Sequence, residues 1–295
     1  MKLIKPSFRF IDQEDGMKGV LKQIEKAGRV SYKSENKMNE YSYEKFVDML
    51  INAKHLSPLE FGTIYLELPS SDFKASITLN HYLHNQYSRY KNYDGNFIIA
   101  TNFRVIRENG WEEDLQYIID EPKDYPYKRV CVKIICDRSI MCELTRHRNF
   151  SFMVESTRYN NYTKGKFNNQ CTFIIPCWLK NIPACEMSID FDEVEIINGS
   201  EYEKKLISDF DLKEIEWLRA MHYCETSYSN MISFGCTPQE ARSVLPNSLK
   251  TEVFMCGYLE NWKHFFNLRC DGKAHPQMRE ITIPLRKEFE KRYEI

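Results

Sequence analysis

The residues with the clearest chemical potential lie in one stretch near the middle of the chain. Arg146, His147 and Arg148 are consecutive, and after seven further residues Ser156 begins a second polar group that includes Arg158. Successive helical residues diverge by about 100°, so Arg146 and Arg148 would point to different sides, whereas Ser156 and Arg158 would share a face of an extended segment. Guanidinium groups bind planar anions with paired hydrogen bonds. The stretch therefore predicts contacts to more than one anionic group, and the simpler interpretation is a solvated basic helix end.

The spacing of these residues resembles the signature of the flavin-dependent thymidylate synthases, which is Arg-His-Arg, seven residues and then Ser. The longer family form, with an inner Ser and the ending Ser-x-Arg-Tyr, is matched by Ser151, Ser156, Arg158 and Tyr159. Four further segments resemble the family and occur in the family's order, two before the signature at 28–34 and 55–61 and two after it at 241–246 and 262–269. The chain departs from the family at Phe61, where His is usual, and at Met153 and Val154, where many members carry Asn and Glu.

The resemblance implies reductive methylation of dUMP to dTMP, with methylenetetrahydrofolate as carbon donor and NADPH as reductant through FAD. It also implies an α/β fold, a mixed sheet packed with helices, in a homotetramer whose sites are shared between subunits. By this resemblance, Arg269 is the residue that stabilises negative charge developing on the pyrimidine ring. The residues carried over for dUMP binding are Glu143, Arg146, Glu155, Ser156, Thr157, Arg158, Arg242 and Arg269, and those for FAD are His55, Ser57, Glu60, Arg146, His147, Arg148 and His264.

Composition narrows the class of protein. The 295 residues are 42% hydrophobic and 28% charged, with a net charge of −1, as in a globular protein with a sizeable core and no general affinity for nucleic acid. We expect a cytoplasmic protein with no membrane partner, because no long apolar run or signal peptide is recognisable. The ten cysteines include no Cys-x-x-Cys pair, so no metal site is predicted.

The length allows one large domain or two small ones, and the family resemblance implies a single domain over residues 1–295. Asp137 is expected to cap a helix that delivers Arg146 to its end, and Pro246 to stop a helix opened by a capping box at Thr237. Residues 81–128 and 181–200 match the family least and are interpreted as elaborations, the second as a surface excursion. Helices are expected at 15–28, 42–54 and 201–234, the last with room for one break, and strands at 62–68, 74–80, 130–136 and 172–178.

Two other functions remain open at this point. Pro176 and Cys177 are similar to the Pro-Cys pair of the cysteine-dependent thymidylate synthases, in which a thiolate attacks uracil, although the rest of that motif is missing. Alternatively, a single-stranded RNA-binding module could use the Arg-His-Arg segment and the many Tyr and Phe residues as stacking platforms. The neutral net charge argues against the second alternative.

Overall fold

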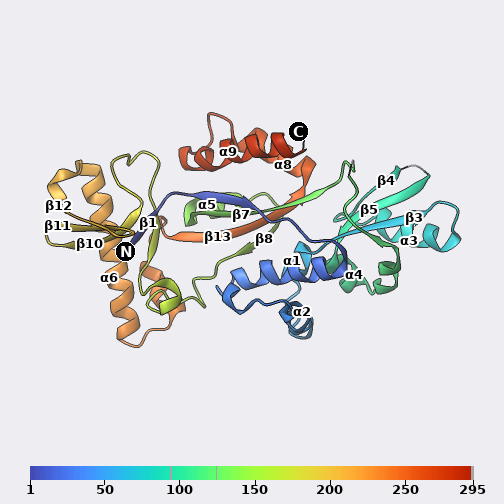
Figure 1. Ribbon diagram of the computed structural model, residues 1–295, viewed down its shortest axis with the longest axis horizontal. Coiled ribbons are helices and arrows are strands. Elements are labelled where there is room, and N and C mark those ends of the chain that lie inside the picture. Colours follow the sequence, from blue (N-terminus) through green and yellow to red (C-terminus); the bar gives the residue numbers. More distant parts are fainter. Residues whose placement is uncertain (94, 124, 294–295) are drawn as a thin grey trace.

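A four-stranded antiparallel sheet forms the centre of the molecule, with the order β2-β7-β13-β8 (Figure 1). The computed structural model describes residues 1–93, 95–123 and 125–293. The two middle strands of the central sheet pair along their whole length. The four strands are β2 (Ser7–Phe10), β7 (Arg129–Asp137), β8 (Ser151–Val154) and β13 (Lys250–Tyr258).

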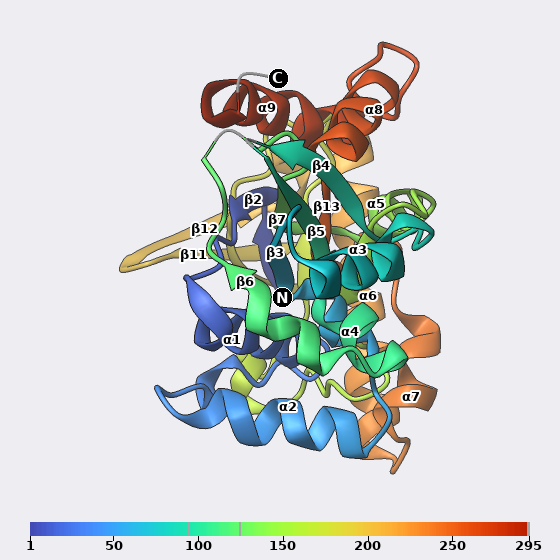
Figure 2. The ribbon, with the colours of Figure 1, turned by 90° about the vertical axis from the view of Figure 1, so that its right-hand side faces the viewer.

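The two faces of this sheet are covered by different helices, because side chains of a strand alternate between faces. Val132 and Met255 point into a core shared with the helices drawn above the sheet in Figure 1, whereas Phe254 and Cys256 pack against Ala27 on the other side. Figure 2 shows the same layering from the side. The covering helices are α5 (Arg138–Leu144), α8 (Leu259–Arg269) and α9 (Pro276–Tyr293) on the first face, and α1 (Gly16–Val30) on the second.

A five-stranded sheet, β12-β11-β10-β1-β9, lies at one end of the molecule. It is mixed, since β1 runs parallel to β9 and antiparallel to β10. The surface excursion predicted at 181–200 is wrong, because residues 185–206 form a three-stranded meander in which Val194 and Ile196 are buried. The helix predicted at 201–234 is confirmed over most of its length, but its first residues belong to this meander. The elements are β1 (Lys2–Ile4), β9 (Thr172–Ile174), β10 (Cys185–Asp190), β11 (Glu193–Asn198), β12 (Glu201–Leu206) and α6 (Leu212–Ser233).

The opposite end holds an antiparallel sheet with the order β4-β5-β3-β6. The strand predicted at 74–80 is a helix instead: Asp72 caps it by accepting from the Lys74 N–H at 2.9 Å, and Ala75, Thr78 and Tyr82 are buried at helical spacing. The expected elaboration at 81–128 supplies most of this end, and within it Asp94 and Asp124 lie outside the described residues. The elements are β3 (Thr63–Pro69), β4 (Arg89–Tyr93), β5 (Asn96–Asn102), β6 (Ile118–Ile119), α2 (Ser42–Asn52), α3 (Phe73–Leu83) and α4 (Phe103–Asn109).

The predicted α/β class is confirmed in its coarse form, as a single chain of helices and sheets, but with three sheets rather than one. The strands predicted at 62–68 and 130–136 are β3 and β7, and the predicted stop at Pro246 follows the short helix α7 (Pro238–Ala241). Within the described part of the chain, no helix is long and apolar enough to cross a membrane.

Candidate functional site

The ends of helices α5 and α8 bring together three of the predicted residues. Helix α5 follows β7 directly and α8 follows β13 directly, so the pairing of these two strands sets the positions of both helices. Arg269 donates through Nε to His147 Nε2 at 2.8 Å, through Nη1 to Glu143 Oε2 at 2.9 Å and through Nη2 to the Glu143 carbonyl at 3.1 Å. Three of the five guanidinium N–H donors are therefore used, and two remain for a ligand.

His147 is held as a neutral hydrogen-bond acceptor. Burial, followed by the neighbouring charges of Arg269 and His264, lowers the pKa of His147 from 6.5 to about 4. The ring packs edge-on against Phe150 and Phe265, with centroid distances of 6.4 and 4.9 Å. At neutral pH the imidazole therefore orients Arg269 without adding a second positive charge.

A second group of predicted residues lies around the turn that follows β8. The Arg242 Nη1 donates to Thr157 Oγ1 at 3.2 Å, and the Arg158 N–H donates to Ser156 Oγ at 3.2 Å. The expectation that Ser156 and Arg158 share a strand face is not met, because β8 ends at Val154 and the chain turns there. Across the described residues, no hydrogen bond or ion pair joins this group to Arg269.

The segment at 28–34 packs against the same turn. The Ser156 N–H donates to the Ser31 carbonyl at 3.1 Å, and the rings of Tyr32 and Tyr159 lie 5.0 Å apart. Met153, one of the departures from the family, accepts from the Ser31 hydroxyl through its sulfur at 2.9 Å. The family resemblance at 28–34 thus corresponds to a physical contact with the signature stretch.

A network of buried ion pairs holds Glu155, the residue that precedes the turn. Glu155 accepts from Lys250 Nζ at 2.8 Å, and the same Lys250 also contacts Glu252 at 2.6 Å. Lys33 and Lys133 contact Glu252 as well. Burial opposes the charge of Glu252, but the three lysines outweigh it, so the pKa of Glu252 is lowered strongly and the carboxylate stays ionised.

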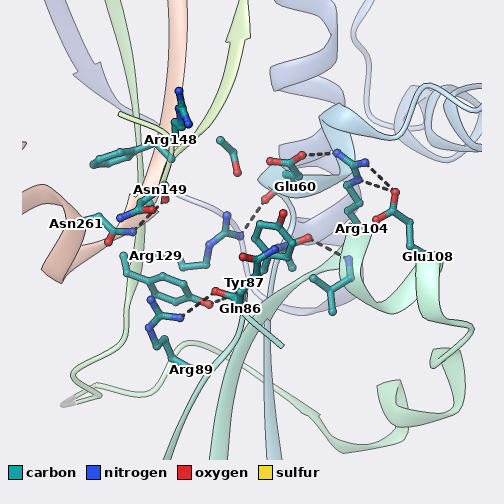
Figure 3. Close-up of a pocket in the computed structure, with 16 residues that line it drawn as sticks. Glu60, Gln86, Tyr87, Arg89, Arg104, Glu108, Arg129, Arg148, Asn149 and Asn261 are labelled. Carbon is teal, nitrogen blue, oxygen red and sulfur yellow. Dashed lines mark hydrogen bonds and ion pairs between the residues drawn. The ribbon is translucent and has the colours of Figure 1, made fainter. Parts of the chain in front are cut away.

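A third group of residues lines a cavity of about 550 Å³, which is drawn in Figure 3. Of the predicted residues, Glu60 and Arg148 line it. The segment 81–128 contributes much of the rest, which the sequence had not assigned to any site. The lining residues from that segment are Gln86, Tyr87, Arg89, Asn102, Arg104, Val105 and Glu108, and the others are Arg129, Asn149, Phe150, Ser151, Gly257, Tyr258 and Asn261.

Several predicted residues lie outside all three groups in the single chain. His55, Ser57, Arg146 and His264 are exposed and do not line the cavity. Phe61, where the family has His, is 1% exposed and packs edge-on against Phe254 with a centroid distance of 6.3 Å, so its side chain belongs to the core.

Comparisons with known proteins bear on the whole chain. Residues 14–131 and 129–293 match the family described as "Thymidylate synthase complementing protein". Similar curated proteins include the flavin-dependent thymidylate synthases of Synechocystis sp. (26% identical over 170 residues, 55% of this chain and 66% of that protein) and of Pyrococcus furiosus (28% over 160 residues, 54% and 53%). The chain thus spans about half to two thirds of the length of these relatives.

Among solved structures, a UMP/dUMP methylase, PolB from Streptomyces cacaoi bound with 5-Br UMP, aligns with 99% of this chain and 92% of its own, at a TM-score of 0.45 and 16% identity. The family match covers nearly all residues in two adjoining segments. The chain belongs to the thymidylate synthase complementing protein family.

Proposed function

We propose that this protein methylates dUMP to dTMP, with FAD as cofactor, methylenetetrahydrofolate as carbon donor and NADPH as reductant. Family membership and the names of the curated relatives support the reaction class. The single observation that carries the proposal is the contact of Arg269 with His147 and Glu143, because it joins two family segments that lie 122 residues apart in sequence.

The chemistry assigned to Arg269 is electrostatic. Carbon C5 of uracil becomes a competent nucleophile only when negative charge can build on the ring nitrogen N3 and the carbonyl oxygens. The two free N–H donors of Arg269 can hydrogen-bond that edge of the ring, and preorganised donors of this kind stabilise developing charge. His147 and Glu143 restrict the guanidinium to one orientation, so little reorganisation is needed during the reaction.

The remaining predicted residues have binding roles in this proposal. Arg146, Arg158 and Arg242 are assigned to the dUMP phosphate, because guanidinium forks match its oxygens, and the Ser156 hydroxyl is assigned to the nucleotide. Arg158 and Arg242 are exposed in the single chain and therefore accessible to a ligand. Burial raises the pKa of Cys177, which disfavours the thiolate that the cysteine-dependent mechanism requires.

The cavity fits the flavin cofactor in size and polarity. Its volume lies within the range of small-molecule sites, and arginines and asparagines that suit phosphate and ring oxygens line it. When bound, FAD supplies the hydride that completes the methyl group. The residues proposed to hold it are Glu60 and Arg148, which line the cavity, together with His55, Ser57, Arg146, His147 and His264.

A homotetramer is part of the proposal, because one chain leaves its predicted residues in separate groups. Closed symmetric assemblies commonly complete sites across subunit boundaries. Mixing an Arg148→Ala chain, which keeps the contact between His147 and Arg269, with an Arg242→Ala/Arg269→Ala chain, after dissociation and reassociation, should restore activity if sites are shared. Differently tagged chains that co-purify yet stay as inactive as either parent argue against shared sites.

The cofactor claim is tested by reconstitution. The protein should quench FAD fluorescence on binding, and the bound flavin should be reduced by NADPH faster when dUMP is present. Protein that remains colourless and leaves FAD fluorescence unchanged contradicts the proposal. The RNA-binding alternative predicts instead that a labelled single-stranded RNA binds, with or without FAD.

A further inference from the structure

We infer that the cavity binds the diphosphate of a dinucleotide ligand and that Arg129, at the start of β7, is its central cationic contact. The inference rests on the proposed function, under which the dinucleotide is FAD. Arg129 is not part of any motif in the sequence. Its side chain is 9% exposed, and in Figure 3 it lies between the turn that carries Arg148 and Asn149 and the segment that carries Glu60.

The hydrogen bonds of the Arg129 guanidinium go to neutral groups. Its Nη1 donates to the Glu60 carbonyl at 2.9 Å and reaches Thr63 Oγ1 at 3.4 Å, and the group lies 5.7 Å from the centroid of the Tyr258 ring. Burial opposes the charge of Arg129, whereas Cys256, Tyr258, Tyr65 and Glu60 favour it, so its pKa is raised and the side chain is cationic. A buried cation held in this way is preorganised for an anion.

The other charges of the cavity leave Arg129 without a carboxylate partner. Arg104 contacts both glutamates that line the cavity, Glu60 at 2.6 Å and Glu108 at 2.8 Å. Arg89 pairs with Glu260 at 2.8 Å. Among the described residues, neither Arg129 nor Arg148 has a carboxylate within ion-pair distance. The lining therefore has an excess of positive charge, and Arg104 prevents the Glu60 carboxylate from repelling an anion.

Two features favour a dinucleotide diphosphate over a lone phosphate. Arg129 and Arg148 come from different elements and both line the cavity, so each guanidinium fork can serve one phosphate group. The cavity of about 550 Å³ also exceeds what a single phosphate fills, and Tyr87 presents a 57% exposed ring to it, which suits a planar base. The amides of Asn149 and Asn261 add donors and acceptors for ring edges.

The test compares ligands that differ in phosphate content, using the apoprotein. Binding of FAD and riboflavin is followed by fluorescence quenching, and binding of ADP by displacement of FAD. Arg129→Gln should weaken the binding of FAD and of ADP by about tenfold or more, because hydrogen bonds between charged groups are among the strong ones. The affinity for riboflavin should stay within about twofold of the wild-type value. Arg9→Gln, an exposed arginine on the adjacent strand β2, is the matched control and should change none of the three.

Equal losses for FAD and riboflavin, or no loss, overturn the assignment of Arg129. If Arg129→Gln does not fold, Arg148→Gln decides, because Arg148 is exposed and should show the same phosphate-selective loss. Flavin binding by the wild-type protein distinguishes a failure of the proposed function from a failure of the assignment of Arg129. A wild-type protein that binds no flavin overturns the proposed function and this inference together, whereas tight FAD binding that is insensitive to both substitutions overturns only this inference.

Discussion

Protonation of His147 should destabilise the protein, because the neutral ring accepts the hydrogen bond from Arg269. Its folded-state pKa, about 4, lies below the unfolded value of 6.5. The unfolded chain therefore binds a proton first, and the stabilisation is complete above pH 6.5 and is lost as the pH falls towards 4. A pKa difference of this size corresponds to as much as ~3 kcal/mol of unfolding free energy. Since the ring is only half-buried, we expect about 1 to 2 kcal/mol after solvent screening.

The measurement is denaturant unfolding of the apoprotein at pH 7 and pH 4.5, for the wild type and for His147→Gln. Gln offers an acceptor but does not titrate, so subtracting its pH dependence removes the contributions of carboxylates and of the other histidines. The wild type should lose about 1 to 2 kcal/mol more than His147→Gln between the two pH values. A difference near zero, or an NMR titration that gives a pKa near 6.5 for His147, refutes the reasoning.

Three further outcomes follow from the contacts of the site. Arg269→Lys keeps the charge but loses the planar fork, so we expect a ~100-fold or greater fall in dTMP formation with FAD content retained; activity within a few-fold of the wild type, measured by product assay, contradicts this. Ser156→Ala should raise the dUMP concentration needed for half-maximal rate and cost less than Arg269→Ala, and a variant that binds dUMP normally yet loses all chemistry points to a nucleophile instead. Glu252→Gln leaves three lysines without their shared carboxylate and should lower the unfolding free energy by about 3 kcal/mol, whereas Glu201→Gln, at an exposed position of β12, should change it by less than about 0.5 kcal/mol.

The local pattern of hydrophobic residues predicted those helices and strands whose buried positions recur with a single regular spacing. Strand β7 was identifiable because its run of β-branched residues is buried on both faces. Helix α3 was mistaken for a strand because Lys74–Asn80 also alternates, and only the cap at Asp72 and the tertiary burial of Tyr82 favour the helix. The hairpins at 185–206 were missed because their outer strand is almost wholly polar and exposed, so pairing rather than hydrophobicity defines it.

The residues of the site could be predicted from the sequence where they belong to family motifs. Glu143, His147 and Arg269 were assigned from the family resemblance, but their mutual hydrogen bonds depend on the register of β7 and β13, which no local pattern reveals. Arg129 could not be found from sequence. An arginine at the start of a strand is usually a surface charge, and its burial beside Glu60 emerges only when segments 69 residues apart pack together.

The most direct test of the central claim is product formation by the purified, FAD-reconstituted protein. It is incubated with dUMP, NADPH and methylenetetrahydrofolate labelled with ¹³C in the methylene group, and the nucleotides are analysed by mass spectrometry. The account predicts dTMP that carries ¹³C in its methyl group and that fails to form when FAD, NADPH or the folate is omitted. Protein that binds both FAD and dUMP in this assay yet forms no labelled dTMP would contradict the account.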